Sequence, residues 1–261
     1  MPMKINPFAT LALAGITCLL AGAGCKINSA TTPPRQATCV LVHGAWGGGW
    51  DWRHVDDLLT ADDHKVFRAT LTGLGERSHL SSTNIALDTH IQDVVNVILW
   101  ENLHDVVLVG HSYGGMVITG VADQVPDRIR CLVYVDALLP ENGESVNAVV
   151  PTNHINQKVQ DGYILPVWVT GSPPPPHDVP MPAKCFSQPI ILTNQAAAQK
   201  IPSTYILTVD AGAPPADDLF YKFYRRAQSR GWPAWIMEGD HNVQRSHSQE
   251  LVRLIEKAGQ K

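Results

Sequence analysis

The chain has 261 residues, of which 44% are hydrophobic and 17% are charged. This composition excludes a disordered, collagen-like or coiled-coil chain, because it supplies enough apolar surface for a packed core and shows no sustained repeat. The 20 Lys and Arg residues against 24 Asp and Glu residues give a net charge of −4, and no run of basic residues occurs. The balance disfavours a nucleic-acid-binding protein and favours small-molecule chemistry.

The N-terminal 25 residues have the layout of an export signal. Residues 8–24 form an uncharged, glycine-containing apolar stretch, which follows a segment whose only charged side chain is Lys4. The stretch is too short and too rich in glycine for a membrane span, and it predicts a secretory signal peptide over residues 1–25. It ends in AGAGC, so Cys25 is a candidate for lipidation, as in bacterial lipoproteins. We therefore predict an exported protein, periplasmic, secreted or anchored to a bacterial membrane through Cys25.

A folded domain is expected over residues 37–261, after a polar, proline-containing linker at residues 26–36. Within it, short apolar runs alternate with segments of helical length. The strand candidates are residues 39–44, 65–71, 105–110, 131–139, 203–210 and 233–239, and the helical segments include 89–101, 114–124, 217–229 and 246–258. This alternation predicts an α/β fold with a mostly parallel central sheet covered by helices on both faces. Functional residues in such sheets gather at the carboxyl ends of the strands.

One region, at about residues 140–188, interrupts the alternation. Prolines and polar residues crowd together there, including the four consecutive prolines at 173–176. An insertion of this length is either a lid or a disordered linker. Its large apolar side chains, Tyr163, Leu165, Trp168 and Phe186, favour an ordered lid.

Removal of the first 25 residues would leave three cysteines, an odd number that cannot all pair within the chain. Cys39 and Cys131 each begin an apolar run, so we expect them to pack as small hydrophobic residues, and we expect no essential disulfide involving them or Cys185. No Cys or His spacing typical of a metal site occurs, and no metal or other cofactor is expected.

Two glycine-rich motifs follow strand candidates and indicate nucleophilic catalysis. Residues 110–115 read GHSYGG between an apolar run and a helical pattern, the context of a nucleophile elbow, so Ser112 is the predicted nucleophile. The motif HGAWGGGW follows the first strand candidate. Its alternative interpretation is an ordinary turn, but beside a nucleophile elbow it predicts an oxyanion hole formed by the backbone N–H groups of Ala45 and Tyr113. His43 is expected to shape this loop rather than to catalyse.

A serine nucleophile needs a general base, and the base needs a carboxylate that orients it. His241 follows the last strand candidate and is the predicted base, whereas His247 falls inside the next helix. Asp210, which ends TYILTVD, is the expected acid, and Asp136, which ends CLVYVD, is its rival. Asp240 is interpreted as a loop residue, because consecutive residues seldom face each other.

From about Thr38 to its C-terminus the sequence resembles the α/β-hydrolase superfamily. Within that superfamily it is similar to the branch of plant methylesterases, hydroxynitrile lyases and related bacterial esterases. The motifs that carry the resemblance occur in the expected order: LVHGAWGGGW, LTGLGERSHL, LVGHSYGGMVITG, YVDALLPENGES, QPIILTN, YILTVD and GDHN. The resemblance implies an α/β-hydrolase fold with a small lid and the triad of Ser112, Asp210 and His241.

The resemblance also implies an oxyanion hole formed by the amides of Ala45 and Tyr113. The sequence departs from the pattern of the branch at two places. The segment YILTVDAGAPP is slightly shorter than its counterpart in relatives. The lyases of this branch have Thr and Lys where this chain has Ala45 and Asn242. Without that lysine to handle cyanide, the lyase reaction is disfavoured.

The function predicted is a serine hydrolase that cleaves carboxylic esters through an acyl-enzyme intermediate. Two alternatives stay open: a cofactor-free perhydrolase or amidase with the same triad, and a non-catalytic small-molecule-binding protein on the same fold. The expected partner is a small or medium ester, aromatic or aliphatic. Side chains that could line its pocket or serve ordinary packing are Trp46, Leu74, His79, Leu138, Trp168 and Phe186.

Overall fold

The computed structural model describes residues 36–150 and 158–260. The predicted signal peptide, the candidate lipidation site at Cys25 and all but the last residue of the predicted linker lie outside the described residues. Export and lipidation therefore stay predictions.

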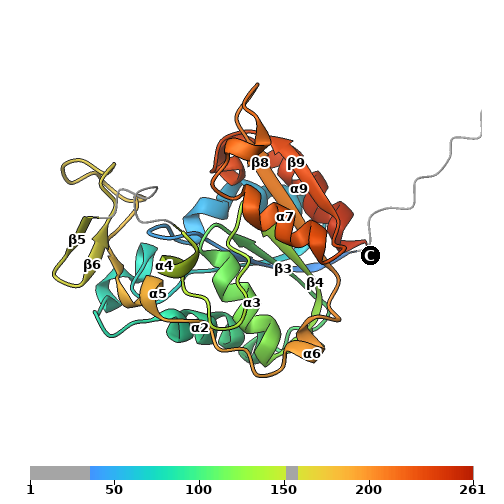
Figure 1. Cartoon of the computed structure of the whole chain (residues 1–261), viewed down its shortest axis with the longest axis horizontal. Helices are drawn as coiled ribbons and strands as arrows, with labels where there is room; N and C mark the ends of the chain where they lie inside the picture. Colours follow the sequence, from blue (N-terminus) through green and yellow to red (C-terminus); the bar gives the residue numbers. More distant parts are fainter. Residues whose placement is uncertain (1–35, 151–157, 261) are drawn as a thin grey trace, which may run out of the picture. The chain divides into compact units, whose positions relative to one another are not determined.

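A parallel sheet of six strands forms the centre of the domain (Figure 1). The strand order is β2-β1-β3-β4-β8-β9, and each strand falls on one of the predicted runs. The strands are β1 (Thr38–Val42), β2 (Lys65–Ala69), β3 (Val106–His111), β4 (Ile129–Val135), β8 (Ser203–Val209) and β9 (Ala234–Glu238). β3 and β8 are buried along their whole length, because helices cover both faces of the sheet.

Two hydrophobic cores lie on opposite faces of this sheet. One packs α2 (Leu87–Trp100), α3 (Gly114–Gln124) and α7 (Tyr221–Ser229) against it, and the other packs α1 (Arg53–Ala61) and α9 (Ser248–Gly259). Four of these five helices correspond to predicted segments. Helix α1 was not predicted, although Val55, Leu58 and Leu59 recur with helical spacing and face the core.

The insertion, residues 140–188, carries a small antiparallel sheet of its own in its described part. This sheet consists of β5 (Lys158–Gln160), β6 (Tyr163–Leu165) and β7 (Met181–Pro182), and its hairpin stands away from the central sheet in Figure 1. Buried Ile164, Met181 and Phe186 tie it to the core. The short elements around it and elsewhere are α4 (Val146–Val149), α5 (Lys184–Ser187), α6 (Gln195–Ala198), α8 (Val243–Ser246), η1 (Gly49–Trp52), η2 (Gly75–Leu80), η3 (Pro126–Arg128) and η4 (Pro215–Asp217).

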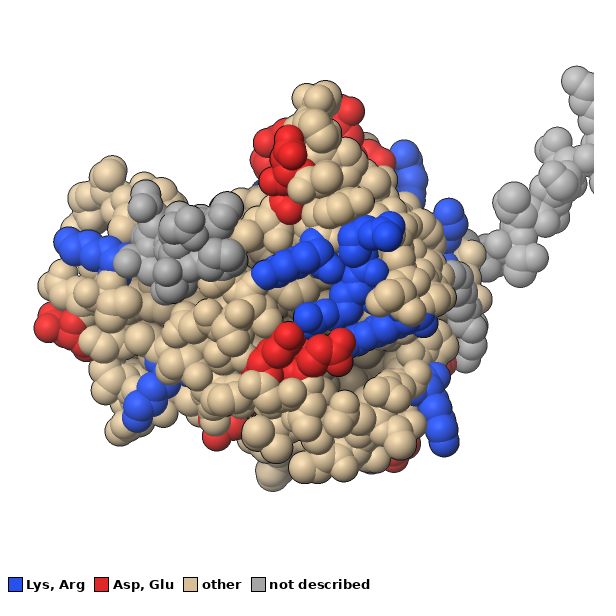
Figure 2. Space-filling view, in the orientation of Figure 1, with Lys and Arg blue, Asp and Glu red and all other residues tan. Residues whose placement is uncertain are grey.

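Basic residues are balanced by acidic neighbours on the face that carries α7. Figure 2 shows Lys and Arg side chains gathered there beside a group of acidic side chains. Arg226 pairs with Glu144 at 2.6 Å, and Arg230 pairs with Glu141 at 2.6 Å. Among the residues that the structure describes, no helix is long and apolar enough to cross a membrane, and no cluster of His, Cys, Asp and Glu could hold a metal ion. Cys39, Cys131 and Cys185 are all buried, as expected for cysteines that pack in the core.

Candidate active site

Ser112 lies in the sharp turn between β3 and α3. Its φ of +53° places it in the left-handed region, a strained conformation for a residue with a side chain. Gly115 makes the turn possible, because a Cβ at this position would collide with the carbonyl oxygen of Leu138. The backbone N–H of Leu138 donates to the carbonyl of Ser112 at 3.0 Å and holds the turn against the loop after β4. The sequence therefore forms the predicted nucleophile elbow.

His241 and Asp136 complete a hydrogen-bonded chain with the serine. The Ser112 Oγ lies 3.0 Å from His241 Nε2, and His241 Nδ1 lies 2.6 Å from Asp136 Oδ2. Because Nδ1–H donates to the carboxylate, Nε2 is left unprotonated and accepts the serine hydroxyl hydrogen. Asp136 is only 1% exposed, and its other oxygen accepts the backbone N–H of Thr208 at 3.2 Å. The three groups come from the carboxyl ends of β3, β4 and β9.

The expectation that Asp210 orients His241 is wrong. In the register of β4 and β8, Val135 pairs with Ile206, so Asp136 is level with the next residue of β8, Leu207. Asp210 is three residues further along β8, roughly 10 Å beyond that level at about 3.3 Å per residue. It also stands on the strand beyond β4 from the nucleophile, and it is exposed. The rival Asp136 forms the hydrogen bond to His241 instead, and it lies between Ser112 and His241 in the chain.

The loop that carries His241 is fixed by its neighbours. His111, inside the elbow, donates from Nε2 to the carbonyl of His241 at 2.7 Å. Burial holds the pKa of His111 well below its usual value, so this ring stays neutral beside the imidazole of His241. Phe220 stacks on that imidazole, with ring centres 4.9 Å apart. Asp240 is a loop residue, as predicted: its Oδ1 accepts the backbone N–H of Asn242 at 2.7 Å.

The two backbone N–H groups predicted to form the oxyanion hole have no hydrogen-bond acceptor among the described residues. Neither the N–H of Ala45 nor that of Tyr113 donates a hydrogen bond to another of the described residues. The Tyr113 hydroxyl lies 3.0 Å from Nδ1 of His90, whose Nε2 lies 3.0 Å from the carbonyl of Thr72. Burial lowers the pKa of His90 to about 4, so the neutral ring donates to Thr72 and accepts from Tyr113. This anchor fixes the side chain of the residue that follows Ser112.

His43 shapes the loop of Ala45, as predicted. Its Nδ1 donates to the carbonyl of Gly44 at 2.8 Å, and its Nε2 accepts the N–H of Leu71 at 3.1 Å. Burial lowers the pKa of His43 to about 4. The ring is therefore a neutral link between Gly44 and Leu71, and both of its nitrogens are engaged in structural hydrogen bonds.

A cavity of about 380 Å³ opens over Ser112. Of the predicted pocket residues, Trp46 and Trp168 line it, and their rings meet edge to face at 5.0 Å. The Trp46 indole N–H donates to the carbonyl of Ile164 in β6, which joins the oxyanion loop to the insertion. The full lining is Gly44, Ala45, Trp46, Asp51, His111, Ser112, Trp168, Asp178, His241, Asn242 and Arg245.

The other predicted pocket residues lie elsewhere. Leu74 and Leu138 are buried in the core, and His79 is exposed on η2, outside the cavity lining. Phe186 is buried beneath the cavity wall, where it packs against Trp46 and stacks on Tyr113. It therefore supports the wall without lining it.

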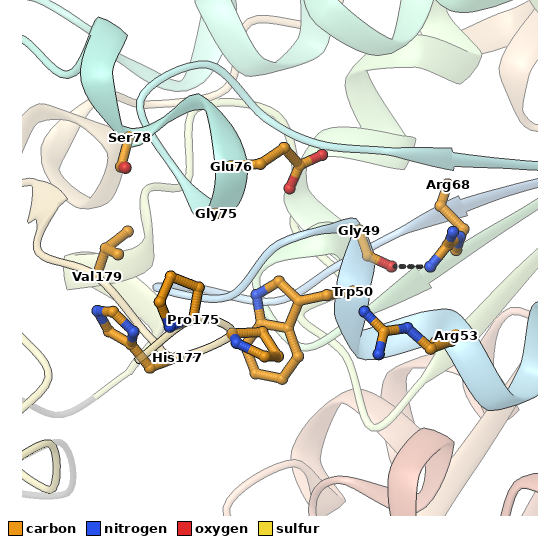
Figure 3. A pocket seen from close by; sticks show the side chains of 11 residues that line it. Gly49, Trp50, Arg53, Arg68, Gly75, Glu76, Ser78, Pro175, His177 and Val179 are labelled. Atoms are coloured by element: carbon orange, nitrogen blue, oxygen red, sulfur yellow. Dashed lines mark hydrogen bonds between the residues drawn. The ribbon is translucent and has the colours of Figure 1, made fainter. Parts of the chain in front are cut away.

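Three charged lining residues were not predicted from the sequence: Asp51, Asp178 and Arg245. They are far apart along the chain and belong to no motif, so no local signal marks them. A second cavity, of about 660 Å³, lies next to this one (Figure 3). It is lined by Trp50 and His177, the residues that precede Asp51 and Asp178 in the chain. That larger cavity, which Arg53, Arg68 and Glu76 also line, contains none of the residues of the hydrogen-bonded chain.

Comparisons with known proteins agree with the fold. Residues 39–254 match the model of the alpha/beta hydrolase family. A carbendazim hydrolyzing esterase of Nocardioides sp. (strain SG-4G) is 56% identical over 116 residues, 44% of this chain and 48% of that protein. Methylesterase 2 of Arabidopsis thaliana is 35% identical over 117 residues, 44% of each protein. The chain thus matches about half the length of these curated relatives.

Solved structures show the same fold over most of the chain. An extracellular alpha/beta-hydrolase from a Paenibacillus species superposes with a TM-score of 0.67 at 24% identity and covers 86% of this chain and 100% of its own. The methylesterase MES16 from Arabidopsis superposes with a TM-score of 0.64 at 23% identity and covers 85% and 98%. The family model, the nucleophile elbow and this shared fold together show that the chain belongs to the alpha/beta hydrolase family.

Proposed function

We propose that this protein is a serine hydrolase that cleaves carboxylic esters through an acyl-enzyme intermediate. The observation that carries the proposal is the continuous hydrogen-bonded chain from Ser112 through His241 to Asp136, with distances of 3.0 and 2.6 Å. The named relatives, a carbendazim hydrolyzing esterase and plant methylesterases, support ester hydrolysis.

In the proposed reaction each group has one role. His241 Nε2 takes the hydroxyl proton as Ser112 attacks the ester carbonyl, and the amides of Ala45 and Tyr113 bind the oxyanion that forms. His241 then gives the proton to the leaving alcohol. In deacylation it takes a proton from water, which attacks the acyl group, and returns that proton to Ser112. Asp136 keeps the imidazole in the required tautomer and stabilises its charged form.

The alternatives predict different behaviour at the same site. A non-catalytic binding protein has no need for a strained serine that is hydrogen-bonded to an oriented imidazole, so the geometry favours catalysis. A perhydrolase or an amidase would use the same triad and differs in the attacking nucleophile or the leaving group. The size of the cavity and its two indole walls support small aromatic or aliphatic esters. We include carbendazim among the candidate substrates, because a relative is named for its hydrolysis.

The test is hydrolysis of p-nitrophenyl acetate by the wild type, by Ser112→Ala and by the matched control Ser78→Ala. Ser78 is an exposed serine of η2, outside the lining of the cavity that holds Ser112. We expect activity in the wild type and the control, and its loss in Ser112→Ala with unchanged folding by circular dichroism. Full activity in the folded Ser112→Ala variant would contradict the proposal. Parallel assays with amides, and with hydrogen peroxide as the competing nucleophile, separate the enzymatic alternatives.

A further inference from the structure

Three charged side chains form a bridge across the wall of the catalytic cavity. Arg245 pairs with Asp51, and its guanidinium lies 3.8 Å from Asp178. Asp51 belongs to η1 in the oxyanion loop, Arg245 to α8 behind the histidine loop, and Asp178 to the insertion. The charged bridge therefore joins the three segments that surround Ser112, and all three of its members line the cavity.

The bridge is held in place by its surroundings. Arg245 lies over the ring of Trp50, 4.4 Å from its centre. Asp178 accepts the indole N–H of Trp168 at 2.7 Å. The Asp51 side chain is only 4% exposed, and burial raises its pKa to about 6 despite the opposing effect of Arg245. At pH 8 this carboxylate is ionised, and the bridge then contains two negative charges and one positive charge.

We propose that the charged bridge selects substrates by charge, so that the cavity accepts neutral esters and rejects esters that carry a carboxylate near the scissile bond. This inference rests on the proposed esterase function. A carboxylate on the substrate would meet Asp51 and Asp178, which repel it. Arg245 cannot compensate, because its guanidinium already faces both acids. Drawing Arg245 toward the substrate would leave the buried carboxylate of Asp51 without its partner, which is costly.

Asp178 is the member whose charge can be removed with least change to the packing. In Asp178→Asn the amide oxygen can still accept the indole N–H of Trp168, while one negative charge disappears. Arg245 is then balanced by Asp51 alone, and the net charge of the bridge becomes zero. The matched control is Asp161→Asn, which makes the same change of charge on the same insertion, at an exposed turn outside the lining of the catalytic cavity.

The test compares two acetate esters that have a similar shape and differ in charge. They are neutral 4-acetylphenyl acetate and anionic 4-carboxyphenyl acetate, assayed at pH 8 and low salt. The measured quantity is kcat/KM for the anionic ester divided by kcat/KM for the neutral one. We expect Asp178→Asn to raise this ratio about tenfold, since two unit charges interact by more than the energy of a tenfold step even at about 8 Å in partly solvated surroundings. In Asp161→Asn the ratio should stay within about twofold of the wild type, as for an exposed charge far from the reacting groups.

A second variant gives the opposite prediction. Arg245→Gln removes the positive charge, so the ratio should fall below that of the wild type. The inference is overturned if Asp178→Asn leaves the ratio unchanged, including the case in which both activities fall together, or if Asp161→Asn raises it equally. Such a result would leave the esterase function standing, because hydrolysis of the neutral ester reports that function separately.

Discussion

The replacement of Asp136 by asparagine tests the assignment of the catalytic acid. The backbone N–H of Thr208 donates to Oδ1 of Asp136, and His241 Nδ1 lies 2.6 Å from Oδ2. In Asp136→Asn the side-chain amide oxygen continues to accept the N–H of Thr208. The amide nitrogen therefore faces the imidazole of His241. A donor at this position forces Nδ1 to accept and leaves the proton on Nε2. His241 is then unable to take the proton of Ser112.

The size of the effect follows from this change of tautomer. The same Asp-to-Asn substitution in the triad of chymotrypsin-like proteases lowers kcat about 10⁴-fold. This factor corresponds to roughly 5.5 kcal/mol, at about 1.36 kcal/mol per tenfold step. We expect a loss of similar order, about 10³ to 10⁴, because Asp136 is buried and its carboxylate bonds directly to the imidazole. The exposed Asp210 makes no hydrogen bond to His241, and Asp210→Asn should therefore change kcat by less than about twofold, as surface substitutions usually do.

The assay is steady-state hydrolysis of p-nitrophenyl acetate by the two variants, with thermal unfolding as the control for folding. Asp136→Asn is nearly isosteric, so a folded and slow enzyme is the expected result. A loss of activity in Asp210→Asn together with near-normal activity in Asp136→Asn would refute the assignment. Similar large losses in both variants would show that the acid function is not confined to Asp136.

Three further variants test buried groups, two of them beside the site and one distant from it. Burial lowers the pKa of the His90 imidazole from 6.5 to about 4, so the unfolded chain binds a proton on His90 more tightly than the folded chain, and stability is lost as the pH falls from about 6.5 toward 4. Urea unfolding at pH 7 and at pH 5 should show that the wild type loses about 2 kcal/mol more stability between the two pH values than His90→Gln does. Equal losses in the two proteins would contradict this prediction. Gly115→Ala places a Cβ against the carbonyl of Leu138 and should lower the free energy of unfolding by about 1 to 3 kcal/mol and reduce activity, whereas wild-type behaviour would show that the elbow has room. Asp123→Ala removes a buried carboxylate that accepts two backbone N–H groups before α6, so the free energy of unfolding in denaturant should fall by about 2 to 3 kcal/mol. The kcat should stay unchanged, because Asp123 lies outside the lining of the catalytic cavity. A large fall in kcat would show that Asp123 acts on the site as well.

The central sheet and the nucleophile elbow were predictable because their signals are local. A strand buried on both faces is a continuous apolar run, and β3 and β8 are such runs. The elbow needs small residues within a few positions of Ser112, so its motif is contiguous. Helix α1 also has a local signal, the helical spacing of Val55, Leu58 and Leu59, and it was overlooked although that pattern is present.

The identity of the acid was not predictable in the same way. It depends on the register between β4 and β8, which are separated by the whole insertion, and a residue at the end of either strand satisfies the chain order. The slightly short segment around Asp210 put the register of that residue in question, but it did not indicate which other residue takes its place. The charged bridge of Asp51, Asp178 and Arg245 had no signal, because its members meet only through the tertiary fold.

The central claim is that Ser112 is an activated nucleophile that becomes covalently acylated. Labelling of the folded protein with a fluorophosphonate, followed by peptide mapping by mass spectrometry, tests it directly. We predict a single phosphonyl adduct on the Ser112 hydroxyl in the wild type, none in Ser112→Ala, and much slower labelling in Asp136→Asn. An unlabelled wild type, or an adduct that persists in Ser112→Ala, would contradict the account.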